Sequence, residues 1–117
     1  MSLEIKDYDA SGFLEIEELH NLKYEGDIEF HFYLTLTIGN KGTDSGDLFS
    51  ILVMTPMANQ DYSINKHEKH YLIKYGDNWE TIYNSLSEIV KSCSADSWAE
   101  SVRKLSKHFR WEYEGIR

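Results

Sequence analysis

The stretch that decides the fold reads Ile28-Glu-Phe-His-Phe-Tyr-Leu-Thr-Leu-Thr-Ile38, then Gly39-Asn-Lys-Gly-Thr-Asp-Ser-Gly-Asp47, then Leu48-Phe-Ser-Ile-Leu-Val-Met-Thr55. Its first segment alternates strictly, and this period of two predicts a long strand with one buried face. The expected buried residues are Ile28, Phe30, Phe32, Leu34, Leu36 and Ile38. The residues between them, Glu29, His31, Tyr33, Thr35 and Thr37, are expected on the other face.

The middle segment contains the residues that turns prefer. Gly39, Gly42 and Gly46 lie among asparagine, aspartate and serine. The third segment is rich in apolar and β-branched side chains, so the chain is predicted to return as an antiparallel hairpin. A phosphate loop is not expected here, because these glycines join two strands and do not precede a helix.

The N-terminal part gives weaker signals. Leu3, Ile5 and Tyr8 predict a short first strand that residues 9–12 end. Residues 13–24 fit one edge of a helix or the start of a strand, and we predict irregular chain with a short turn. After Pro56 a polar loop is expected, followed by a strand over residues 71–75.

Two amphipathic helices are predicted near the C-terminus. Apolar residues recur at three- and four-residue spacing from Trp79 to Cys93, after a cap at Asp77 or Asn78. A second helix begins after Ser97, which with Glu100 has the spacing of a capping box. A short strand over residues 111–113 is expected to close the chain. The prediction is an α+β fold: a mainly antiparallel sheet of four to five strands, with the two C-terminal helices packed on one face.

Length and composition favour one domain over residues 1–117. Hydrophobic residues make up 41% of the chain, which is enough for a core. The single cysteine, Cys93, cannot form an internal disulfide, so we expect a cytoplasmic protein. The N-terminus has no basic start followed by an apolar run, and we expect neither a secretory signal nor a membrane span.

The charge is negative and uneven. The formal net charge is −8, and positions 1–30 hold nine acidic residues against two lysines. Such a chain is not expected to bind nucleic acid directly, because phosphates would be repelled. An acidic surface either keeps the protein in solution or meets a basic partner.

Catalytic and cofactor sites are not expected. His67 and His70, with His31 as a third candidate, do not have the spacing of a helical metal motif, and an exposed polar loop is the preferred interpretation. Cys93 continues an apolar helix stripe and is expected to be buried. Trp79, Trp98 and Trp111 are expected in the core, with a binding anchor as the alternative. We expect no cofactor and no enzymatic activity.

Several segments together resemble the immunity protein 8 family of bacterial polymorphic toxin systems. They are Phe32-Tyr-Leu-Thr-Leu-Thr-Ile-Gly-Asn-Lys-Gly42, Asp47-Leu-Phe-Ser-Ile-Leu-Val-Met-Thr-Pro56, His70-Tyr-Leu-Ile73, Tyr75-Gly-Asp-Asn-Trp79, Ser97-Trp98 and Trp111-Glu-Tyr113. The resemblance begins at about Gly26 and departs from the family at Met57-Ala58, where many relatives have a Trp-Leu pair. It implies an antitoxin that binds and neutralises the toxin domain encoded beside it, with a nuclease as one candidate toxin.

The expected partner-binding residues follow from the acidic N-terminal part and the outer face of the long strand. Acids would attract a basic toxin, and a tyrosine would anchor it. The candidates are Glu15, Glu17, Glu18, Glu25, Asp27, Glu29 and Tyr33. The outer strand face also fits an ordinary solvated surface. The alternative function is a regulatory or small-ligand-binding domain, and the sequence is compatible with a monomer or a homodimer.

Overall fold

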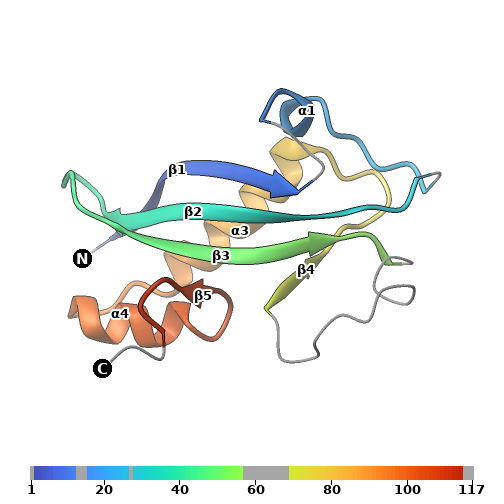
Figure 1. Ribbon diagram of the computed structural model, residues 1–117. Coiled ribbons are helices and arrows are strands. Elements are labelled where there is room, and N and C mark those ends of the chain that lie inside the picture. The colour runs from blue at the N-terminus through green and yellow to red at the C-terminus, as the bar shows by residue number, and fades with distance from the viewer. Residues whose placement is uncertain (1, 13–15, 27, 57–68, 115–117) are drawn as a thin grey trace.

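A computed structural model describes residues 2–12, 16–26, 28–56 and 69–114, which form a sheet covered by helices on one side (Figure 1). Four strands follow the order β1-β2-β3-β4, and β5 also pairs with β3. The elements are β1 (Leu3–Gly12), α1 (Ile16–His20), β2 (His31–Asn40), β3 (Asp47–Met54), β4 (His70–Leu72), α3 (Trp79–Ser92), α4 (Trp98–Leu105) and β5 (Arg110–Trp111). The predicted α+β class is confirmed, as a mixed and mostly antiparallel sheet.

The predicted hairpin is β2 paired antiparallel with β3. Its register places Phe32 opposite Val53 and Leu36 opposite Phe49, so these buried side chains share one face. The strand begins later than predicted, at His31, and Ile28 is 62% exposed. The regular pairing ends there because Phe30 bonds to Thr55, the residue after β3. Thr55 N donates to Phe30 O, but Phe30 N donates to the side-chain hydroxyl of Thr55 and not to a backbone carbonyl.

The prediction that residues 9–12 break the first strand is wrong. β1 runs from Leu3 to Gly12 and pairs with β2 along its length. The register shifts between Ile5 and Asp7, which leaves Lys6 as the extra residue of a β-bulge. The bulge moves the inward positions from odd to even numbers, so Leu3 and Ile5 share a face with Tyr8.

Two short strands complete the sheet along the same edge of β3. β4 is parallel to β3, with Val53 opposite Tyr71, and it is shorter than the predicted strand over residues 71–75. β5 is antiparallel to the other half of β3, with Phe49 opposite Trp111. The C-terminal strand was therefore predicted correctly, although it covers only residues 110–111.

The C-terminal helices begin where the capping signals indicate. Asn78 caps α3, and a capping box is complete because Thr81 N donates to Asn78 Oδ1 and Asn78 N donates to Thr81 Oγ1, each at 2.9 Å. Ser97 caps α4 by accepting from Glu100 N at 3.1 Å. The predicted return bond from Glu100 is absent within the described chain, because this carboxylate binds Arg103, and the pKa of Glu100 is lowered accordingly.

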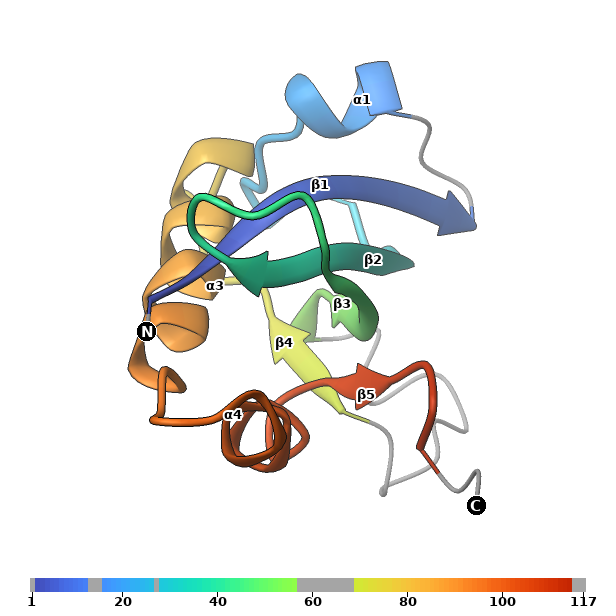
Figure 2. The same cartoon turned by 90° about the vertical axis from the view of Figure 1, so that its left-hand side faces the viewer.

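Of the segment over residues 13–24, which was predicted to be irregular with a short turn, residues 13–15 lie outside the described chain. Residues 16–20 form α1, a short helix in place of the predicted turn, and Leu19 on its inner side is fully buried. α1 lies beyond the outer edge of β1 in both views of the molecule (Figures 1 and 2).

The core lies between the sheet and the two C-terminal helices, α3 and α4, which share one side of the sheet (Figure 2). Trp79 and Cys93 are buried as predicted, at 9% and 3% exposure, whereas Trp98 and Trp111 are half-buried against the core. The side of the sheet away from α3 is called the open face below. Its exposed residues, by strand register, are Asp7, Asp9, Ser11, Tyr33, Leu48 and Arg110.

Candidate partner-binding surface

Glu17 and Glu18 lie in the first turn of α1 and are exposed. Leu19 is buried, and the Tyr8 hydroxyl lies 2.8 Å from Nε2 of His20, so the helix is held against β1. The two carboxylates therefore stand on an anchored element and face solvent. Two other predicted acids, Glu15 and Asp27, lie outside the described residues.

Glu25 follows α1 and forms an ion pair with Lys23 at 3.4 Å. Both side chains are more than half exposed, so the pair contributes little to stability. The backbone between them is fixed, because Tyr24 N donates to Asp77 O and Tyr24 O accepts from Gly76 N, each at 2.8 Å. Glu25 is thus presented at a fixed position, with part of its charge balanced by the lysine.

Glu29 is half-buried and has a structural role. Its carboxylate accepts from Thr55 Oγ1 at 2.5 Å, and the same hydroxyl accepts from Phe30 N at 3.1 Å. Thr55 is fully buried. These bonds join the start of β2 to the end of β3, so Glu29 is less available to a partner than the acids of α1.

Tyr33 lies on the open face, as the alternation predicted, and is 41% exposed. It stands opposite Ser11 on β1 and Leu52 on β3. Glu17 and Glu18 lie instead on α1, beyond the outer edge of β1 (Figure 1), and Glu25 lies on the segment after α1. The described candidates are therefore divided between two surfaces, α1 with the segment after it and the open face.

The sequence interpretation missed Asp7 and Asp9 as members of the open face. The register after the bulge places Asp7 opposite Thr37 and Asp9 opposite Thr35, and both carboxylates are exposed. The alternation of these acids with Tyr8 and Ala10 was the available signal. This signal was missed because residues 9–12 were predicted to break the strand.

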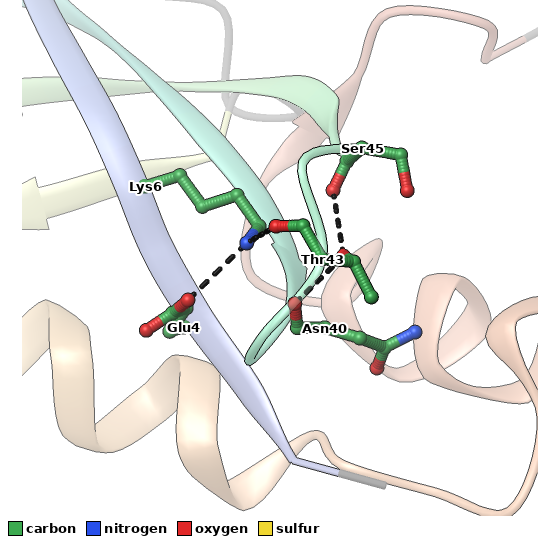
Figure 3. A network of polar contacts seen from close by, with 5 residues as sticks. All are labelled: Glu4, Lys6, Asn40, Thr43 and Ser45. Atoms are coloured by element: carbon green, nitrogen blue, oxygen red, sulfur yellow. Dashed lines mark hydrogen bonds and ion pairs between the residues drawn. The ribbon is translucent and has the colours of Figure 1, made fainter.

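The turn between β2 and β3 is held closed by side chains from β1 (Figure 3). The bulged Lys6 pairs with Glu4 at 3.2 Å and donates to Thr43 O, while Thr43 Oγ1 donates to Asn40 O at 2.8 Å. Next to this turn lies a hollow of about 270 Å³, lined by Gly39, Asn40, Ser45, Gly46, Asp47 and Trp98.

A second hollow, of about 200 Å³, lies on the open face between β3 and β5. Its lining includes Leu48, Phe49 and Trp111. Both hollows are smaller than the roughly 300–1,000 Å³ typical of small-molecule sites. A side chain of a protein partner fits such dimensions better than a cofactor.

Within the described chain there is no group of three histidine, cysteine or acidic side chains that could hold a metal ion. His67, one of the two clustered histidines, lies outside the described residues. Burial raises the pKa of the Cys93 thiol, so this residue is a buried apolar side chain and not an activated nucleophile. No described helix is long and apolar enough to cross a membrane.

Comparison with protein-family models matches residues 3–115 to the family described as immunity protein 8. Comparisons with curated proteins and with solved structures give no match. The family match covers nearly the whole chain, including the N-terminal quarter in which the sequence resemblance was weakest. The chain therefore belongs to the immunity protein 8 family, whose members are non-enzymatic inhibitors that neutralise a cognate toxin.

Proposed function

We propose that this protein protects its cell by binding the toxin domain encoded beside it, and that this toxin is a nuclease with a basic substrate groove. The family match carries the first part of the proposal. The net charge of −8 supports the second, because a basic groove attracts an acidic inhibitor. Since nucleic acid is the target in this proposal, neutralisation takes place in the cytoplasm.

The proposed contact residues are the N-terminal acids with an aromatic anchor. Of the described members, Glu17, Glu18 and Glu25 are exposed on backbone that is held by buried neighbours. Tyr33 offers 41% of its surface from the open face. The complete proposed set is Glu15, Glu17, Glu18, Glu25, Asp27, Glu29 and Tyr33.

Inhibition of this kind requires no chemistry by the inhibitor. Surface acids raise the rate of encounter with a basic toxin, and a few desolvated contacts set the dissociation rate. Either one copy of the chain or a homodimer can act in this way. Light scattering of the purified protein, alone and with the toxin domain, distinguishes these stoichiometries.

Growth rescue tests the function itself. Expression of the toxin domain alone is expected to stop growth, and co-expression of this protein is expected to restore it. A catalytically inactive toxin domain serves as the control for expression burden. Failure of this protein to restore growth, when it accumulates to the same level as the toxin, would contradict the proposal.

Reversing the acids of α1 tests the steering part of the proposal. Glu17→Lys with Glu18→Lys is expected to slow association by about tenfold at low salt and to weaken its salt dependence, because two attractive charges become repulsive. Stopped-flow fluorescence measures both quantities. The matched control is Glu80→Lys with Glu88→Lys, which makes the same charge change on exposed positions of α3. Equal slowing by both pairs would show that only net charge matters.

A further inference from the structure

Two large apolar side chains are exposed on the open face. Tyr33 is 41% exposed and Leu48 is 45% exposed, whereas Leu52 and Met54, which share this face by register, are buried. Tyr33 stands opposite Leu52, which is four residues from Leu48 along β3. Tyr33 and Leu48 therefore lie about 14 Å apart along the strand direction. That separation fits within one protein interface.

The hollow between β3 and β5 lies beside Leu48 and has fixed walls. Trp111 stands opposite Phe49 on the core side of the sheet, where its Nε1 donates to Asp47 Oδ2 at 2.9 Å and fastens β5 to β3 from behind the hollow. Glu112 N donates to Leu48 O at 3.0 Å, and Leu48 N donates to the Glu112 carboxylate. These bonds hold β5 against β3. An apolar side chain of a partner can enter the hollow with little ordering cost, because its walls are already in place.

Charge surrounds this apolar centre unevenly. Asp7 and Asp9 are exposed on β1, where they pair in register with Thr37 and Thr35 of β2. Arg110 is exposed on β5, at the opposite edge of the hollow. Strands are about 4.8 Å apart, so the aspartates lie about 10 Å from β3 and form a rim to the apolar centre. A partner with basic residues on one side of an apolar anchor is thereby attracted and oriented.

We infer that the open face is the main toxin-docking surface, that an apolar toxin side chain enters the hollow between β3 and β5, and that toxin lysines or arginines meet Asp7 and Asp9. This inference rests on the proposed function. It moves the centre of the interface from α1 to the sheet, with Tyr33 and Leu48 as the two anchors. The acids of α1 then act on encounter and contribute little to the bound complex.

Calorimetry with the toxin domain tests this surface. Leu48→Ala and Tyr33→Ala are each expected to raise the Kd by about tenfold or more, as truncation of a central anchor does. Asp7→Asn with Asp9→Asn is expected to raise the Kd and to reduce its salt dependence. Tyr75→Ala is the matched apolar control, because Tyr75 is 79% exposed and lies against Gly26, away from the open face. Glu80→Gln with Glu88→Gln is the matched charge control.

Each outcome has one meaning. Control variants that bind like the wild type, together with weakened open-face variants, support the inference. If the wild type binds, and the Kd values of Leu48→Ala and Tyr33→Ala lie within twofold of the wild-type Kd, the inference is overturned and the proposed function stays intact. Absence of wild-type binding would overturn the proposed function itself. Circular dichroism verifies folding, and Leu48→Thr replaces Leu48→Ala if the alanine variant is unfolded. Loss of self-association without loss of toxin binding would assign this face to a second copy and contradict the inference.

Discussion

Gly39 and Gly42 flank the turn between β2 and β3 and are required for different physical reasons. A Cβ at Gly39 would lie 2.1 Å from Ser45 O and 2.9 Å from Cε of Lys6, so this position lacks space. Gly42 has φ +84°, and a Cβ there would meet nothing within 4 Å, so this position needs glycine only for its left-handed conformation. Turn composition alone does not separate these two requirements.

Alanine at Gly39 is expected to destabilise the fold by about 1–3 kcal/mol, because the clash is with backbone that cannot move aside cheaply. Gly42→Ala is expected to cost about 1 kcal/mol, and Gly42→Asn less, since asparagine tolerates the left-handed region. Urea unfolding measures the free energy of unfolding of the three variants. A Gly39→Ala protein as stable as Gly42→Asn would contradict this explanation of the turn.

Cys93 is expected to be unreactive in the folded protein. It is 3% exposed, and burial raises the pKa of its thiol, so little thiolate forms at neutral pH. A thiol reagent at pH 8 should label it only after unfolding in urea, with glutathione as the control for reagent activity. Labelling of the native protein at the rate of glutathione would contradict burial.

The raised pKa of Cys93 also sets a direction for stability against pH. The folded thiol holds its proton more tightly than the unfolded one, so its contribution is fully present below the unfolded pKa. That contribution is lost as the pH rises through the folded pKa. Cys93→Ala should therefore show less alkaline loss of stability than the wild type, as measured by urea unfolding between pH 7 and pH 10. An identical loss in both proteins would contradict this assignment.

At the scale of elements, the bulge at Lys6 determines which side chains of β1 enter the core. Leu3 and Ile5 precede it, and Tyr8 follows it, yet all three face the helices. A regular strand cannot achieve this, because its inward positions stay either odd or even. The bulged residue also binds the β2–β3 turn through Thr43 O, so one position serves both strand register and turn closure.

Deleting residue 6 is expected to destabilise the protein by about 2–3 kcal/mol or more, because a one-residue slip turns Leu3 out of the core or displaces Tyr8. Lys6→Ala keeps the bulge and should cost less, about 1–2 kcal/mol, since it removes the polar contacts and the packing of a side chain that is 16% exposed. Urea unfolding compares the two. Equal stabilities would mean that the bulged register is not required.

Elements whose signals are local were predictable from the sequence. The hairpin of β2 and β3, the caps at Asn78 and Ser97, and the burial of Cys93 all follow from patterns within a few residues. The length and bulge of β1 were not predictable in this way, because they depend on pairing with β2, which lies far along the chain. The exposure of Ile28 has the same cause, since alternation continues past the point where partner strands end.

The candidate surface was only partly predictable for the same reason. Alternation placed Tyr33 outward correctly, because that needs only strand periodicity. The neighbourhood of Tyr33 depends on registers, and these add Asp7 and Asp9 from β1 and the hollow beside Leu48 from β5. Charge counting identified the acidic N-terminal part but could not divide it between α1 and the open face.

At the scale of the whole molecule, α3 and α4 cover one side of the sheet, and the proposed docking surface lies on the other. α3 and α4 lie on the core side (Figure 2). The open face carries the exposed side chains of Tyr33 and Leu48, with the exposed Asp7 and Asp9 on β1. Membership of the immunity protein 8 family implies that the chain binds and neutralises a cognate toxin.

Calorimetric titration of the neighbouring toxin domain with this protein tests the central claim most directly. The expected result is a complex with nanomolar Kd and a defined stoichiometry, whose affinity falls as salt is raised. Absence of a binding signal, with both proteins folded and at concentrations far above micromolar, would contradict the claim that this chain neutralises that toxin by binding it.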